Sequence, residues 1–184
     1  LFDKYLRSYE NIYEFGCGSG YHLLRMRQYN KLARLVGLDW TTSSQEIIKV
    51  MSTYNILDNI ESYRFDFYDP DYALDIPLNS GIVTVAALEQ VGDKFEPFLQ
   101  FLLSKRPAIC LHLEPINELL DESNLLDYLS IQYSKKRNYL RGFLDRLKIL
   151  EDQGIVKIHA AKRTYTGSFF LEGHALVVWL PIGD

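Results

Sequence analysis

A glycine-rich loop directly after a short apolar segment is the feature that most constrains this chain. Residues Asn11–Phe15 have the β-branched and aromatic content of a buried strand, and Gly16, Gly18 and Gly20 follow at alternate positions. Glycine lets the backbone approach a ligand where a Cβ atom would collide. The apolar side chains of Tyr21–Tyr29 recur near helical spacing, so the loop leads into a helix N-terminus. This order of strand, loop and helix predicts a site for a nucleotide-like ligand.

The spacing of the loop argues against a dinucleotide. The dinucleotide pattern G-x-G-x-x-G requires its third glycine where this chain has Tyr21, and the third glycine is instead Gly20. Glu14 lies two residues before the first glycine, and its carboxylate would repel a pyrophosphate. A NAD-binding domain of an oxidoreductase is therefore the weaker alternative, and a ligand that carries an ammonium group suits this acid better.

The segment from Glu14 to Gly20 resembles the glycine loop of the class I S-adenosylmethionine-dependent methyltransferases, which has the form acid-x-Gly-x-Gly-x-Gly. The resemblance implies S-adenosylmethionine as the cofactor, held by Glu14, Gly16, Gly18 and Gly20. That cofactor carries an amino group, a carboxylate and a sulfonium but no phosphate, so an acid is tolerated beside it. The resemblance also implies a doubly wound α/β fold with a mostly parallel seven-stranded sheet, helices on both faces and a C-terminal antiparallel hairpin.

The remainder of the chain fits such a fold, because predicted strands and helices alternate along it. We expect strands at 33–39, 60–67, 81–86, 108–113, 154–163 and 175–180, helices at 45–54 and 93–103, and a long helical stretch at 125–153 broken near Ser134 or Gly142. The short connection between the last two strands predicts that they pair antiparallel. A chain of 184 residues is the size of a single domain, here residues 1–184. The chain begins at Leu1 and not at a methionine, so a longer parent chain stays open.

Further cofactor contacts are expected where the second and third strands end. Asp39 ends the second strand, where a carboxylate can accept hydrogen bonds from a ribose diol. Trp40 follows it and either packs on the adenine or belongs to the core. The family resemblance implies that Asp66 binds the adenine amino group and that Phe67 packs on the ring. Without the resemblance, Asp66 would be interpreted as a surface carboxylate at a turn.

The segment after the fourth strand, residues 87–91, resembles the Leu-Glu-His-Val segment of many small-molecule methyltransferases. The resemblance places Leu88 beside the methionine part of the cofactor and the loop beside the acceptor. Gln90 replaces the histidine of that segment, and a glutamine cannot take a proton at neutral pH. Glu89 is therefore one candidate base.

His112 is the other leading candidate base. Strand alternation puts His112 and Glu114 on the same side of the fifth strand, near its carboxyl end, where ligands bind in open α/β sheets. A satisfied polar pair at the sheet edge is the competing interpretation. His159 and His174 are further candidates.

Composition narrows the function. The net charge of −4 disfavours nucleic acid as the main partner, no apolar run is long enough for a membrane span, and two cysteines fit a reducing, cytoplasmic compartment. We expect no metal site, and the sequence indicates no oligomeric state. The sequence predicts methyl transfer to a small-molecule acceptor, such as a sugar or another metabolite. The alternative is a domain with the methyltransferase fold that binds partners or cofactor without catalysis.

Overall fold

The computed structural model describes residues 1–168 and 173–182, and its centre is one seven-stranded sheet. The strand order is β3-β2-β1-β4-β5-β7-β6, in which the first five strands are parallel and β7 runs antiparallel to both of its neighbours. The strands are β1 (Asn11–Phe15), β2 (Arg34–Asp39), β3 (Ile60–Arg64), β4 (Ser80–Val85), β5 (Ile109–Glu114), β6 (Val156–Arg163) and β7 (Ala175–Pro181). This is the predicted doubly wound fold with its C-terminal antiparallel hairpin.

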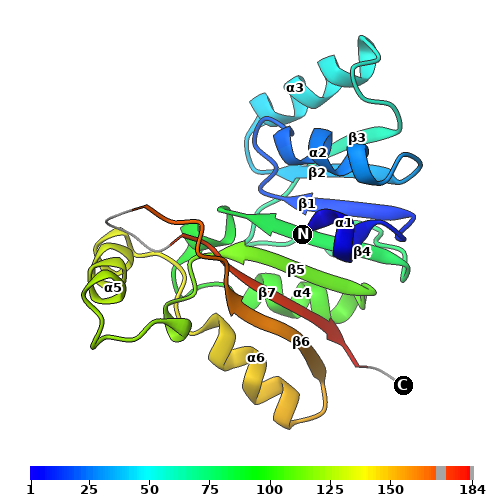
Figure 1. Ribbon diagram of the computed structural model, residues 1–184. Helices are drawn as coiled ribbons and strands as arrows, with labels where there is room; N and C mark the ends of the chain where they lie inside the picture. Colours follow the sequence, from blue (N-terminus) through cyan, green and yellow to red (C-terminus); the bar gives the residue numbers. More distant parts are fainter. Residues whose placement is uncertain (169–172, 183–184) are drawn as a thin grey trace.

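Helices cover both faces of the sheet (Figure 1). The α-helices are α1 (Phe2–Leu6), α2 (Tyr21–Tyr29), α3 (Thr42–Thr53), α4 (Glu96–Lys105), α5 (Leu125–Arg137) and α6 (Phe143–Asp152), and two 3-10 turns are η1 (Leu88–Val91) and η2 (Asn117–Leu119). One core cluster joins α4, α6 and η1 to the sheet, and a second joins α1, α2 and α3 to its other face. Figure 1 shows α5 standing away from the sheet, beyond the carboxyl ends of the parallel strands.

Several predicted elements begin or end up to three residues away from their bounds in the structure, whereas the break in the long helical stretch lies where it was predicted. The third strand ends at Arg64 and not at Phe67, because the Asp66 carboxylate accepts a hydrogen bond from the Tyr68 N–H and closes a turn. Phe65 meanwhile packs its ring against Phe15, with centroids 4.6 Å apart. The predicted break in the long helical stretch falls at residues 138–142, where Asn138 and Gly142 both have positive φ.

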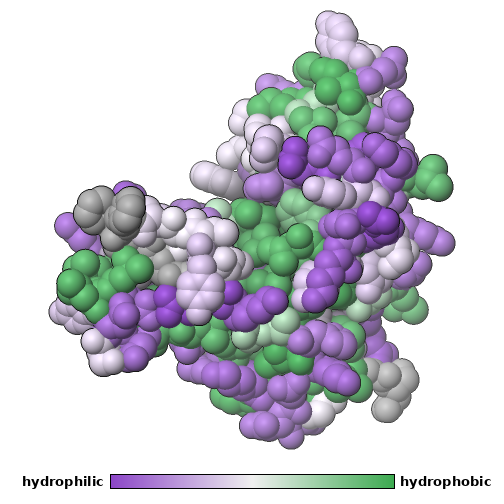
Figure 2. Space-filling view, viewed as in Figure 1, coloured by the Kyte–Doolittle hydropathy of each residue, from purple (hydrophilic) through white to green (hydrophobic). Residues whose placement is uncertain are grey.

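The carboxyl ends of β1, β2, β4 and β5 meet at one edge of the sheet, because these strands are parallel. Figure 2 shows that the molecule is hollowed on this side, between the part that contains α5 and the part that contains α2 and α3. Within the described residues, no helix is both long and apolar enough to cross a membrane.

We expect Gly37→Ala to destabilise the protein. A Cβ at this β2 position would lie 2.3 Å from Ile48 Cδ1, 2.9 Å from Cys17 Sγ and 3.0 Å from Leu23 Cδ1, so three buried groups would have to move together. Overpacking of this kind costs about 1–3 kcal/mol of unfolding free energy.

Gly81→Ala is the matched control, since its added Cβ crowds only the end of the Leu6 side chain, at 2.8 Å. Urea denaturation should show a clearly larger loss for Gly37→Ala than for Gly81→Ala. Equal losses would mean that the packing between β2 and α3 is looser than described.

Candidate active site

The glycine loop between β1 and α2 has a backbone that only glycine adopts easily. Gly16, Gly18 and Gly20 all have positive φ, at 74°, 50° and 74°. A Cβ at Gly16 would lie 2.2 Å from the Ala87 Cβ, so the loop packs directly on the turn that precedes η1. A Cβ at Gly18 would meet no atom within 4 Å, so this part of the loop faces open space.

Asp39 fixes this loop to the end of β2. Its carboxylate accepts hydrogen bonds from the Gly18 N–H at 3.0 Å, the Thr41 N–H at 3.0 Å and the Thr41 hydroxyl at 2.8 Å. The sequence predicted Asp39 as a ligand contact, and the structure adds that it holds the loop in place. Carboxylate oxygens accept more than one hydrogen bond each, so these contacts leave capacity for a ligand.

A first cavity, of about 540 Å³, opens beside the loop. Residues at or just after the carboxyl ends of β1, β2 and β3, in the turn after β4 and in η1 line it. Its lining residues are Gly16, Asp39, Trp40, Phe65, Asp66, Phe67, Tyr68, Ala86, Ala87, Gln90 and Val91. Five predicted cofactor residues therefore lie in one cavity, namely Gly16, Asp39, Trp40, Asp66 and Phe67.

Glu14 lies beneath the loop and not in the lining of the first cavity. Its side chain is fully buried, and its Oε1 is 2.8 Å from His22 Nδ1 at the start of α2. Burial raises the pKa of Glu14, while the hydrogen bond to Glu14 raises the pKa of His22. The prediction of Glu14 as a direct cofactor contact stays a prediction.

Leu88 is not placed where the sequence predicted. It is fully buried in the core cluster formed with α4 and α6, and it lines neither of the cavities described here. Ala86 has a φ of 50°, and after this turn Ala87 and Gln90 face the first cavity instead. We therefore exclude the Leu88 side chain from the candidate site.

A second cavity, of about 200 Å³, lies on the other side of η1 and extends toward α5. Its lining is mostly polar and aromatic and comes from η1, the segment after β5, α5, β6 and the start of β7. The lining residues are Glu89, Pro115, Ile116, Asn117, Leu120, Ser130, Tyr133, Ser134, Tyr139, Arg163, Gly173, His174 and Ala175. Since Glu89 lines this cavity and Gln90 lines the first, η1 is the wall between the two.

Glu89 is one of two predicted bases that line a cavity in the structure, and His174 is the other. The Glu89 side chain is 10% exposed, its Oε1 accepts a hydrogen bond from Gln90 Nε2 at 3.0 Å, and its Oε2 lies 3.9 Å from His174 Nε2. Burial raises the pKa of Glu89, and burial lowers the pKa of His174. A carboxyl group with a raised pKa is a better proton acceptor than a solvated one.

Sequence reasoning missed most of the second cavity. Tyr133, Tyr139 and Arg163 carry no recognisable motif and reach the site through the path of the chain between β5 and β7. Two signals were available, namely the place of the 125–153 stretch, whose first half lies where the resembled family has substrate contacts, and the break that ends α5 at Asn138.

A chain of hydrogen bonds that runs from β7 through β5 and β4 explains the position of η1. The Trp179 indole N–H donates to His112 Nε2 at 3.0 Å, and His112 Nδ1 is 2.9 Å from Thr84 Oγ1. Because an indole nitrogen can only donate, His112 carries its proton on Nδ1 and donates it to Thr84. The Thr84 hydroxyl then donates to the Glu114 carboxylate.

Glu114 ends this chain of hydrogen bonds at the backbone of η1. Its two carboxylate oxygens accept hydrogen bonds from the N–H groups of Ala87, Leu88 and Glu89 at 3.1–3.2 Å. Burial raises the pKa of Glu114 to about 7. His112 and Glu114 therefore have a structural role, in which hydrogen bonds through Thr84 orient η1. This agrees with the competing interpretation of the two residues as a satisfied polar pair at the sheet edge.

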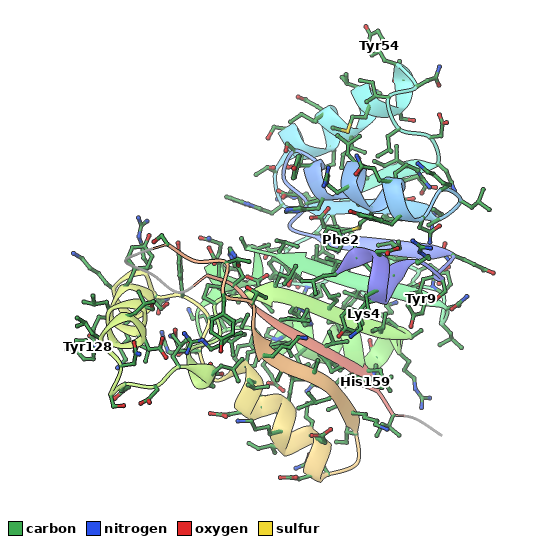
Figure 3. All side chains as sticks on the ribbon, viewed as in Figure 1. Phe2, Lys4, Tyr9, Tyr54, Tyr128 and His159 are labelled. Atoms are coloured by element: carbon green, nitrogen blue, oxygen red, sulfur yellow. The ribbon has the colours of Figure 1, made fainter. Side chains whose placement is uncertain are left out.

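His112 itself is wrong as a candidate base. It is fully buried, both ring nitrogens have partners, and burial lowers its pKa to about 3. His159 also lies away from the cavities, exposed on β6 (Figure 3). Of the four predicted bases, only Glu89 and His174 line a cavity.

Comparisons with solved structures identify the fold. The chain matches the methyltransferase domain of bacterial CtHen1-C with a TM-score of 0.68 and 15% identity, over 96% of this chain and 91% of that one. It also matches the O-methyltransferase NcsB1 of neocarzinostatin biosynthesis, which was solved with S-adenosylmethionine and 2-hydroxy-5-methyl naphthoic acid. That match has a TM-score of 0.65 and 14% identity, over 96% of this chain and 50% of that one. The chain matches human N-acetylserotonin methyltransferase, solved with S-adenosylmethionine, with a TM-score of 0.64 and 15% identity, over 96% of this chain and 48% of that one.

The chain has the fold of class I S-adenosylmethionine-dependent methyltransferases. This confirms the fold that the glycine loop predicted. The chain spans about half the length of NcsB1 and of the human enzyme. No family model and no curated protein matches its sequence.

We expect His112 to make the protein sensitive to acid. Its folded pKa of about 3 lies below its ordinary value of 6.5, so the unfolded state binds the extra proton first and stability falls as the pH falls through this interval. Between pH 6.5 and about pH 5 this residue should cost about 2 kcal/mol.

The control is His112→Gln, which keeps hydrogen-bonding groups but has no proton to gain. Glu114 has a raised pKa and therefore makes stability change with pH in the opposite direction, in the parent and in the variant alike. The difference in unfolding free energy between the two proteins therefore isolates His112. Urea denaturation at several pH values measures that difference. Parallel stability curves would contradict a buried neutral His112.

Proposed function

We propose that the protein transfers a methyl group from S-adenosylmethionine to a small-molecule acceptor. The observation that carries the proposal is the first cavity, where the glycine loop, two carboxylates and four aromatic side chains meet beside η1. The solved neighbours support it, because NcsB1 and human N-acetylserotonin methyltransferase were each solved with S-adenosylmethionine.

The chemistry of the first cavity fits this cofactor better than a dinucleotide. Asp39 and Asp66 line it, and no lysine or arginine is among its described lining residues. A pyrophosphate would meet two negative charges without compensation, whereas an adenosine without phosphate meets hydrogen-bond acceptors. The open space at Gly18 allows a close backbone approach.

Four residues of the first cavity then have a role toward the cofactor. Asp39 would accept hydrogen bonds from the ribose hydroxyls, and Asp66 from the adenine amino group. Trp40 and Phe67 would pack on the ring, which is consistent with the 69% exposure of Trp40 at the cavity. When bound, the cofactor supplies a methyl group on a sulfonium, which is an excellent leaving group.

The second cavity would hold the acceptor. It shares the η1 wall with the first cavity, and η1 presents Glu89 to it. Orientation of two reactants alone can supply about 7–11 kcal/mol of a barrier, so the rigid wall held by Glu114 matters as much as any base. Glu89 is the group that would receive a proton from the acceptor.

We expect Gly18→Val to abolish binding of S-adenosylmethionine. A valine at a φ of 50° is strained, and its side chain occupies the open space that a ligand needs. Calorimetric titration of the parent protein should show micromolar binding of S-adenosylmethionine and S-adenosylhomocysteine and none of NAD.

Gly154→Val is the matched control. Gly154 also has positive φ, at 73°, and open space around an added Cβ, but it lies in the turn between α6 and β6. This variant carries similar backbone strain and should bind like the parent. Equal loss in both variants would remove the loop from the account, and a preference of the parent for NAD would overturn the proposed function.

A further inference from the structure

We propose that the acceptor in the second cavity is a small amine, bound as its ammonium form against Glu89 and methylated on nitrogen. This inference rests on the proposed function and names its substrate class. It starts from the charges that line the second cavity, which are few and for the most part already compensated.

Arg163 brings a positive charge to the second cavity, but this charge is paired. Its two terminal nitrogens donate to the two carboxylate oxygens of Asp127 at 2.8 Å each, and the Asp127 side chain is 2% exposed. A bidentate pair of this kind is among the strongest contacts between side chains. Arg163 is therefore already committed and does not attract an anionic acceptor as an unpaired arginine would.

Glu89 is left as the uncompensated charge among the described lining residues. His174 is the nearest cationic candidate, but burial lowers its pKa, and the nearby His22 lowers it further, so it is neutral at pH 7. The distance of 3.9 Å between His174 Nε2 and Glu89 Oε2 is too long for a hydrogen bond. This carboxylate oxygen keeps acceptor capacity on the side of the cavity.

The remaining contacts of Glu89 leave its charge in place. The Gln90 amide and the Tyr139 hydroxyl both donate to its carboxylate, and neither is charged. The rings of Tyr133 and Tyr139 lie edge to face, with centroids 6.0 Å apart, and both line the cavity. Aromatic faces attract cations, but the Arg137 guanidinium already lies over the Tyr133 ring, 5.4 Å from its centroid, so that face does not take the ammonium.

A carboxylate also suits an amine better than an alcohol as a proton acceptor. An aliphatic hydroxyl is about as weakly acidic as water, with a pKa of about 15.7, and a carboxylate is far too weak to deprotonate it. An ammonium has a pKa of about 10.4 in water, and burial lowers that value while it raises the pKa of Glu89. The two groups can therefore exchange a proton inside the cavity.

The proposed step balances as follows. One N–H proton of the ammonium moves to a Glu89 carboxylate oxygen, which leaves a lone pair on the amine nitrogen. A C–N bond then forms to the methyl carbon while the C–S bond of the methyl donor breaks, and the electron pair of that bond stays on sulfur. The product is a methylated ammonium, whose positive charge again faces η1.

Three probes of matched shape and different charge test this inference, namely benzylamine, benzyl alcohol and benzoate. Calorimetry in the presence of saturating S-adenosylhomocysteine should show benzylamine binding at least about tenfold more tightly than benzyl alcohol, with benzoate the weakest. Benzoate binding as tightly as benzylamine would overturn the inference. NcsB1 was solved with a naphthoic acid, which is an anion at neutral pH, so the preference expected here is opposite to the one which that structure would suggest.

Glu89→Gln should lower the benzylamine affinity about tenfold and leave that of benzyl alcohol unchanged. Glu122→Gln is the control, because Glu122 is a largely exposed carboxylate 3.6 Å from Lys135 and does not line the second cavity. Equal benzylamine affinity in Glu89→Gln and the parent would overturn the inference.

Two further readouts keep the outcomes separate. Binding of S-adenosylhomocysteine is titrated first, so a failure there contradicts the proposed function, whereas a failure of benzylamine alone contradicts only the amine inference. If Glu89→Gln does not fold, the imidazole proton resonances of His174 in the parent serve instead. They should shift on addition of benzylamine, and unchanged resonances at saturation would place the amine elsewhere.

Discussion

Three backbone N–H groups at the start of η1 donate to a single buried carboxylate, that of Glu114. A buried carboxylate is costly unless hydrogen bonds satisfy it, and these donors together with Thr84 do so. The arrangement ties η1 to the end of β5 and, through Thr84 and His112, to Trp179 on β7. Both cavities depend on it, because η1 is their common wall.

A second carboxylate performs the same task on the other side of the first cavity. Asp39 joins the glycine loop to β2, as Glu114 joins η1 to β5. Gly16 lies between the two anchored segments and packs on Ala87 without a Cβ of its own. The loops at the carboxyl edge of the sheet are therefore held in fixed positions relative to one another. Alignment of an acceptor with a methyl donor requires such fixed positions.

The parts of this site that are local in sequence could be predicted. The loop of three glycines, Asp39 with Trp40, and Asp66 with Phe67 each follow directly from a strand end, and the parallel sheet brings strand ends together. The fold followed from the same pattern of alternating strands and helices, and the break near Gly142 followed from glycine.

The errors came from contacts between distant segments. His112 has the spacing of a base at a ligand crevice, but Trp179, paired with Cys110 across the β5–β7 ladder, donates to its ring and buries it. Leu88 sits in the predicted loop, but the turn at Ala86 directs its side chain into the core. Neither the partner strand nor the turn conformation is visible in a single stretch of sequence.

The central claim is that the first cavity holds S-adenosylmethionine and the wall at η1 separates it from the acceptor. A crystal structure of the protein with S-adenosylhomocysteine tests this claim most directly. We predict that the adenosine contacts Asp39, Asp66 and Phe67 and that the sulfur faces η1 beside Ala87 and Gln90. A ligand bound in the second cavity, or one that leaves the first cavity empty, would contradict the account.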